Sequence, residues 1–195
     1  MSDLLPLMSY CLLMSGTPGP NNVMLTTSGA HFGFRATLPQ ILGILVGGFV
    51  LTLACCLGLG QLFTTYPVIR DALRISGSLY LLYLAWKLCG ASLAQAQPLA
   101  RPLGFVHGAV FQLINPKSWI KAVTLASVFM PAGLPPLQAG LLVALLGTVM
   151  GFPAISMWAL FGVGIRRLLE RPAVQRGFNL CMGGALAVLA LNFLR

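Results

Sequence analysis

The sequence predicts an all-α membrane protein with six transmembrane helices in two inverted three-helix repeats, in which spans one and four are broken at proline motifs. Three observations predict this fold class. The 195 residues are 57% hydrophobic and 8% charged, with a mean hydropathy of +0.88. Several long stretches contain no charged residue. Proline motifs interrupt two of the predicted spans near their middle.

The composition excludes a soluble globular protein. A soluble domain has about 25% charged residues, whereas the twelve basic and three acidic residues of this chain are too few to hydrate its surface. The formal net charge of +9 does not indicate a nucleic-acid partner, because the basic residues are scattered among apolar runs without interleaved aromatics. We therefore expect this protein to lie in the lipid bilayer.

The positions of the charges define the spans, since a transmembrane helix needs roughly 20 predominantly apolar residues. The first three spans lie within Leu4–Ala30, Ala36–Ile69 and Leu73–Leu88. The uncharged run Ala122–Ile165 is too long for one crossing, so we expect its prolines between positions 131 and 136 to divide spans four and five into a hairpin. Val174–Leu194 is the sixth span.

Six spans of this length leave no room for a soluble domain, so residues 1–195 form one membrane domain. We expect repeat one over residues 1–90, a loop over residues 91–103 and repeat two over residues 104–195. Because each repeat holds an odd number of spans, the two repeats are inverted relative to each other, as in many secondary transporters.

Paired glycines in spans two and five support the repeat. Gly43 and Gly47 in span two match Gly147 and Gly151 in span five, and a phenylalanine follows each pair. Such pairs are also common in membrane helices simply because they permit close packing. That packing occurs either within one chain or between the chains of a homodimer.

The basic residues orient the chain, because Lys and Arg are enriched in cytoplasmic loops. If the N-terminus lies outside, the inner loops hold seven basic residues: Arg35, Lys87, Arg101, Arg166, Arg167, Arg171 and Arg176. The outer side then holds three: Arg70, Arg74 and Arg195. We therefore predict that both termini face outward.

The proline motifs break the first span of each half. Thr17–Asn22 reads Thr-Pro-Gly-Pro-Asn-Asn, and Asn115–Trp119 reads Asn-Pro-Lys-Ser-Trp. A proline has no N–H to donate and displaces the carbonyl four residues earlier, so we expect free carbonyls at Met14, Gly16 and Gln112. In lipid each unpaired group costs several kcal/mol, so these carbonyls must face protein, water or a ligand. The alternative is a simple kink, which is common in membrane helices.

Each break also creates a new helix N-terminus, whose dipole favours an anion. One lies at Asn21 and Asn22, which are good capping residues, and a second lies near Lys117. A zwitterion fits this pattern: its carboxylate would lie on the Asn21 and Asn22 helix end or on Lys117. Its ammonium would lie on the freed carbonyls, near the Thr17 hydroxyl and the Gln112 amide.

Two lysines lie inside span four, whereas no acidic residue lies at mid-membrane depth. Lys117 and Lys121 are four residues apart, so they share one helix face, and an intramembrane lysine indicates function. Without a buried carboxylate, any coupling to protons must use Lys117, His31 or His107, or the membrane potential must act on a charged substrate.

No motif indicates an enzyme, a metal site or a cofactor. The sequence contains neither His-Glu-x-x-His nor Gly-x-Ser-x-Gly. The five cysteines form no Cys-x-x-Cys pair and have no histidine at metal-ligand spacing. We therefore predict no catalytic residues, no metal and no cofactor.

The motifs together resemble the LysE/RhtB family of bacterial amino-acid exporters. The resemblance rests on Thr17–Asn22, on Gly33-Phe-Arg, on Gly77–Lys87 in span three and on Asn115–Lys117, and it runs nearly end to end. The chain is most similar to the branch that includes the cysteine and O-acetylserine exporter. Some members of the family carry acidic residues in or near their helices. This chain has only three acidic residues, which argues against a proton relay through a carboxylate.

The resemblance implies a secondary transporter of the bacterial inner membrane that exports small neutral amino acids or derivatives, of the cysteine and O-acetylserine or the homoserine and threonine type, with the proton as a coupling ion. The alternatives are an exporter of basic amino acids, which the two lysines would repel, and a membrane scaffold or accessory subunit that transports nothing. The predicted substrate-binding residues are Thr17, Pro18, Gly19, Pro20, Asn21, Asn22, Gln112, Asn115, Pro116 and Lys117.

Overall fold

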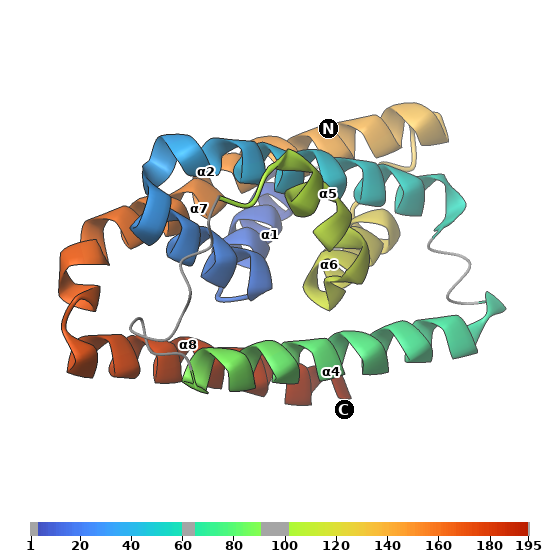
Figure 1. Cartoon of the computed structure of the whole chain (residues 1–195). Coiled ribbons are helices and arrows are strands. Elements are labelled where there is room, and N and C mark those ends of the chain that lie inside the picture. The colour runs from blue at the N-terminus through green and yellow to red at the C-terminus, as the bar shows by residue number, and fades with distance from the viewer. Residues whose placement is uncertain (1–3, 60–64, 91–101, 195) are drawn as a thin grey trace.

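The computed structural model describes residues 4–59, 65–90 and 102–194, and the elements in these ranges are all helical (Figure 1). In chain order they are α1 (Leu4–Gly16), α2 (Pro20–Ala54), the π-helical turn η1 (Cys55–Leu59), α4 (Pro67–Gly90), α5 (Phe105–Ile114), α6 (Pro116–Val128), α7 (Pro136–Leu169) and α8 (Pro172–Leu194). This confirms the all-helical class.

Three stretches of the described helices are long and apolar enough to cross a membrane: Pro20–Leu59, Pro136–Leu169 and Pro172–Asn192. The chain between α6 and α7 turns at residues 129–135, where the predicted hairpin lies. Most of the predicted loop over residues 91–103, including Arg101, and the terminal Arg195 lie outside the described residues.

Helices end at both proline motifs. After α1 ends at Gly16, the next helix begins at Pro20, with Gly19 as its N-cap in an extended conformation (φ −176°). In the second half, Asn115 separates α5 from α6, and its side-chain Oδ1 accepts a hydrogen bond of 3.1 Å from the Lys117 backbone N–H. Proline suits the first helical position because its missing N–H would have no intrahelical partner there.

One detail of the prediction is wrong. Asn21 and Asn22 do not cap α2, because the helix already begins at Pro20 and both asparagines lie in its first turn. The extended backbone of Gly19 and the fixed φ of Pro20 move the helix start one residue earlier. The asparagine side chains are thereby free to reach other groups.

Gly33 divides α2 into two helical segments. Its φ of 79° lies in the left-handed region, which glycine adopts readily. Figure 1 shows α2 changing direction there, so the end of the predicted first span and the second span run in different directions. A hydrogen bond of 2.9 Å between the hydroxyls of Ser28 and Thr37 joins the two segments.

The glycine pair of span two packs against α5. A Cβ at Gly43 would collide with the carbonyl oxygen of Phe105, and a Cβ at Gly47 would lie 2.5 Å from the carbonyl oxygen of Ala109. Because backbones approach this closely only without a side chain, the glycines determine where α5 lies.

The glycine pair of span five packs less closely. A Cβ at Gly147 would lie 3.5 Å from Leu125 of α6 and 3.8 Å from Cys11 of α1, and a Cβ at Gly151 would lie 3.4 Å from Leu45 of α2 and 3.6 Å from Ser15 of α1. These are ordinary side-chain contacts, so a close backbone approach occurs only at the pair of span two. Both Gly-xxx-Gly faces are used within the chain.

Helices α4 and α8 lie side by side along one side of the molecule (Figure 1). Leu81 and Ala85 of α4 pack with Leu186 and Ala190 of α8 in one buried cluster. The other helices surround the two breaks.

We predict that Gly43→Val destabilises the fold by about 1–3 kcal/mol or more, because the added side chain overpacks the α2–α5 contact. The measurement is the thermal unfolding midpoint of the purified protein in detergent. Gly164→Ala is the matched control, since nothing lies within 4 Å of a Cβ at that glycine. Equal midpoints for the two variants would contradict the packing argument.

Candidate functional site

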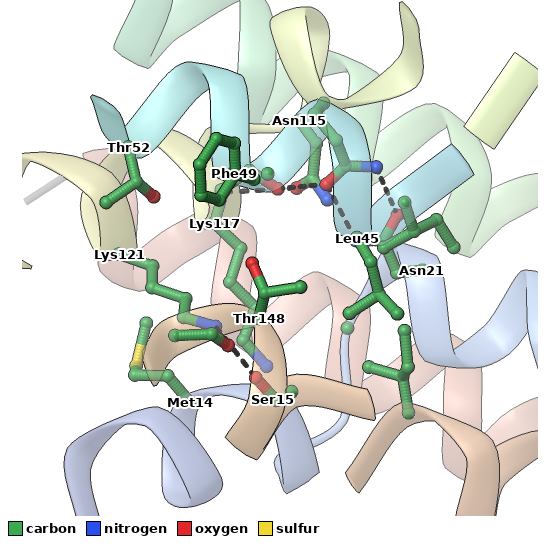
Figure 2. Close-up of a pocket in the computed structure, with 18 of the residues that line it drawn as sticks. Met14, Ser15, Asn21, Leu45, Phe49, Thr52, Asn115, Lys117, Lys121 and Thr148 are labelled. Carbon is green, nitrogen blue, oxygen red and sulfur yellow. Dashed lines mark hydrogen bonds between the residues drawn. The ribbon is translucent and has the colours of Figure 1, made fainter. Parts of the chain in front are cut away.

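A cavity of about 80 Å³ lies between the two helix breaks (Figure 2). Residues of α1, α2, α5, α6 and α7 line it, together with the caps Gly19 and Asn115. Seven of the predicted binding residues line this cavity: Gly19, Pro20, Asn21, Asn22, Gln112, Asn115 and Lys117. The fold thus brings the two motifs, about one hundred residues apart in sequence, to one place.

Three predicted residues do not line the cavity. Thr17 and Pro18 belong to the first break and contribute hydrogen-bond acceptors to a cavity residue, Lys117. Pro116 faces another way, because a Cβ at Gly77 of α4 would lie 2.8 Å from its Cβ.

The side chain of Lys117 joins the second break to the first. Its Nζ donates hydrogen bonds to the carbonyl oxygens of Thr17 (2.7 Å) and Pro18 (3.1 Å) and to the Thr17 hydroxyl (2.8 Å). Of the acceptors expected near a substrate ammonium, the Thr17 hydroxyl therefore binds the ammonium of the protein itself. The two carbonyls that Lys117 binds, of Thr17 and Pro18, are not among the predicted free ones. A lysine ammonium has three donors, so these contacts use its hydrogen-bonding capacity.

A pair of side-chain amides forms a second link between the breaks. Asn21 Nδ2 donates to Gln112 Oε1 (3.0 Å), and Gln112 Nε2 donates to Asn21 Oδ1 (3.2 Å). Gln112 also donates to the Gly108 carbonyl (2.8 Å) and accepts from the Ser118 hydroxyl (2.6 Å). Since Gln112 is only 1% exposed, this network satisfies an amide that would be costly to leave unpaired.

The remaining broken-helix carbonyls have protein partners. Asn22 Nδ2 donates to the carbonyls of Ser15 (2.9 Å) and Thr17 (2.7 Å). The freed carbonyl of Gly16 accepts a 3.1 Å hydrogen bond from the Trp158 indole of α7. We expected these carbonyls to face protein, water or a ligand. The Gly16 carbonyl faces protein.

Lys121 is a cavity residue that the set of predicted binding residues lacks. Its Nζ donates to the Ser15 hydroxyl at 2.9 Å and lies 3.5 Å from the Gly147 carbonyl oxygen. Figure 2 shows the side chains of Lys117 and Lys121 extending into the same space. An intramembrane lysine is a visible sequence signal, but only the fold shows that this one reaches the cavity.

Other lining residues carry no signal in the sequence. Thr52, Thr148 and Ser15 contribute hydroxyl groups, and Leu45 and Phe49 contribute apolar surface. Such residues occur throughout membrane helices, so a single sequence does not mark the ones that face a cavity.

The residues that line the cavity include no Asp, Glu or His. His31 and His107 are both exposed and lie elsewhere. Within the described ranges, no group of three or more His, Cys, Asp or Glu residues is placed to hold a metal ion. The chemistry of the cavity is therefore that of two ammonium groups, amides, hydroxyls and backbone.

Comparison with known proteins gives two kinds of match. A family model described as LysE type translocator matches residues 12–195. A cysteine/O-acetylserine efflux protein of Salmonella typhimurium (strain LT2) is 32% identical over 161 residues, which is 79% of each chain. A protein of the same name from Escherichia coli (strain K12) is 29% identical over 182 residues, 89% of each chain. No solved structure matches the chain.

We predict that Asn21 and Gln112 are energetically coupled. In a double-mutant cycle of Asn21→Ala, Gln112→Ala and the double variant, the coupling should be about 0.5–2 kcal/mol, because each single change leaves a buried amide without its partner. Unfolding midpoints in detergent measure it. Strictly additive effects would show that the amide pair does not join the breaks.

Proposed function

The chain belongs to the LysE-type translocator family, and from this premise we propose that it exports small neutral amino acids or their derivatives across the bacterial inner membrane. It is a multi-pass membrane transporter and not an enzyme. Amino-acid export follows from the family and from the efflux relatives. The observation that carries the finer proposal is the polar cavity between the two helix breaks.

The size of the cavity supports a small substrate. A water molecule needs about 10–15 Å³ of such space, and the cavity offers about 80 Å³. This corresponds to a molecule of a few heavy atoms, comparable to a small amino acid. Cysteine, which the names of the relatives include, and amino acids of the homoserine and threonine type are of this size.

The charge of the cavity supports a neutral amino acid over a basic one. Lys117 and Lys121 both line it, and the first turn of α2 lies beside them at Asn21 and Asn22. The N–H groups of a helix start and the lysine ammonium groups all favour a carboxylate. A second ammonium on the substrate would be repelled.

We further propose six spans in two inverted repeats, over residues 1–90 and 104–195, with both termini outside. The two breaks support this, as do the contacts of α5 with span two and of α1 with span five. A homodimer remains a prediction, and it would need a face other than the glycine pairs of spans two and five, which the chain itself covers. Coupling to protons also remains a prediction.

We predict that Lys117→Ala and Asn21→Ala each lower amino-acid efflux at least several-fold, because each removes a link between the breaks and a group that lines the cavity. The assay measures efflux of labelled cysteine or O-acetylserine from preloaded cells, normalised to protein level. Ser127→Ala is the matched control on α6, since Ser127 is exposed and bonds only within its own helix.

Wild-type efflux rates in both cavity variants would reject the binding site. If cells carrying the unaltered protein export none of the labelled amino acids faster than cells without it, the exporter proposal fails. The scaffold alternative would then account for the chain, because it predicts that the broken helices are dispensable.

We predict that a reporter active only in the cytoplasm is silent when fused after Arg195. The reason is the excess of basic residues in the loops that this orientation places inside. A second fusion after Arg35, which follows the Gly33 break in α2, should be active in the same cells. A strong signal at Arg195 would reverse the topology.

A further inference from the structure

Lys117 and Lys121 share one cavity but differ in their partners. Lys117 has three acceptors, two carbonyls and one hydroxyl, within 3.1 Å. Lys121 has one close acceptor, the Ser15 hydroxyl at 2.9 Å, and a carbonyl at 3.5 Å. Because an ammonium offers three donors, Lys121 retains donor capacity toward the cavity (Figure 2).

Neither acidic residue that the structure describes is a counter-ion to Lys117 or Lys121. Of the acidic residues that the structure describes, Asp71 lies 3.8 Å from Arg74 on α4, and Glu170 is exposed where α7 ends. Neither lines the cavity. A buried cation that is compensated only by neutral groups is unfavourable, and an incoming anion would relieve that cost.

An incoming ammonium finds weaker partners than an incoming carboxylate. The carbonyls of Thr17 and Pro18 already bind Lys117, and the Asn21 and Gln112 amides bind each other. What remains for an ammonium are neutral acceptors, such as the hydroxyls of Thr52 and Thr148 and the amide of Asn22. A carboxylate instead meets a charged donor, and a hydrogen bond between two charged groups is stronger than one to a neutral group.

We propose that Lys121 is the residue that binds the carboxylate of the substrate, and that the cavity recognises its substrate by this carboxylate and does not require the ammonium. The inference rests on the proposed function, the export of small amino acids, and identifies the carboxylate as the group by which they are recognised. It assigns Lys117 a different role, that of holding the two breaks together. It extends the substrate class to small carboxylates whose amino group is acylated or absent.

Three small molecules that differ by the loss of one charged group test the proposal on the purified full-length protein in detergent. L-Serine carries both charged groups, 3-hydroxypropionate lacks the ammonium, and ethanolamine lacks the carboxylate. At a fixed ligand concentration, a bound ligand raises the unfolding midpoint by an amount that grows with the logarithm of its affinity. We expect 3-hydroxypropionate to bind within about tenfold of serine and ethanolamine at least about tenfold more weakly, as the loss of a hydrogen bond to a charged group implies.

Ethanolamine that binds as tightly as 3-hydroxypropionate, or 3-hydroxypropionate that produces no shift, would overturn the proposal. This comparison uses the unaltered protein, so it does not depend on the folding of any variant.

Variants then assign the effect to Lys121. In Lys121→Gln the difference between 3-hydroxypropionate and ethanolamine should disappear, whereas Lys121→Arg should keep it. Ser127→Ala, exposed on the same helix and outside the cavity, is the matched control and should keep the carboxylate preference. Lys117→Gln tests the competing assignment of the carboxylate to the neighbouring lysine. If the preference survives in Lys121→Gln and disappears in Lys117→Gln, the carboxylate binds Lys117 and the proposal is wrong.

Transport is measured in a separate assay, so that the export proposal and the role of Lys121 can be rejected independently. Proteoliposomes that contain the protein are tested for exchange of labelled serine, threonine and cysteine. If none is transported but binding depends on the carboxylate, export of these amino acids is rejected and the role of Lys121 stands. If they are transported while ethanolamine binds as well as 3-hydroxypropionate, export stands and the role of Lys121 is rejected.

Discussion

The pairing of backbone carbonyls inside the membrane is the constraint on which the rest of this structure depends. The prolines of the first motif release carbonyls at a depth where lipid offers no donor. Trp158 from α7 binds one of them, the carbonyl of Gly16. The neighbouring carbonyls of the break bind Asn22 from the same break and Lys117 from α6. The break in span one is therefore stable only because two other helices lie against it.

The same contacts create the cavity. Because Lys117 and the Asn21–Gln112 amide pair join the two breaks, polar groups from both halves of the chain converge at one place. The glycine pair of span two brings α5 close enough for this to happen. The same contacts thus pack the helices, pair the backbone groups and form the site. A substitution that disturbs one of these should disturb the other two.

The prediction of the site from sequence succeeded where chemistry is concentrated in a motif. Two prolines, a glycine and two asparagines within one apolar span cost too much to be incidental, and the residues Gly19 to Asn22 do line the cavity. It was less successful in assigning partners, because the Lys117 ammonium binds the Thr17 hydroxyl, which we expected near a substrate ammonium, and the unpredicted carbonyls of Thr17 and Pro18. Lys121 was noticed as an intramembrane charge, but its place in the cavity depends on the distance to Ser15 of α1.

The sequence by itself determined the environment, the helical class and the places where helices break, because hydropathy and proline act through local chemistry. It also contained the motifs that connect the chain to its family. Only the tertiary structure decided which groups meet across the breaks, that the glycine pairs pack within one chain, and that two lysines share one cavity. These are contacts between residues about one hundred positions apart, and helical periodicity does not specify which face of one helix meets which face of another.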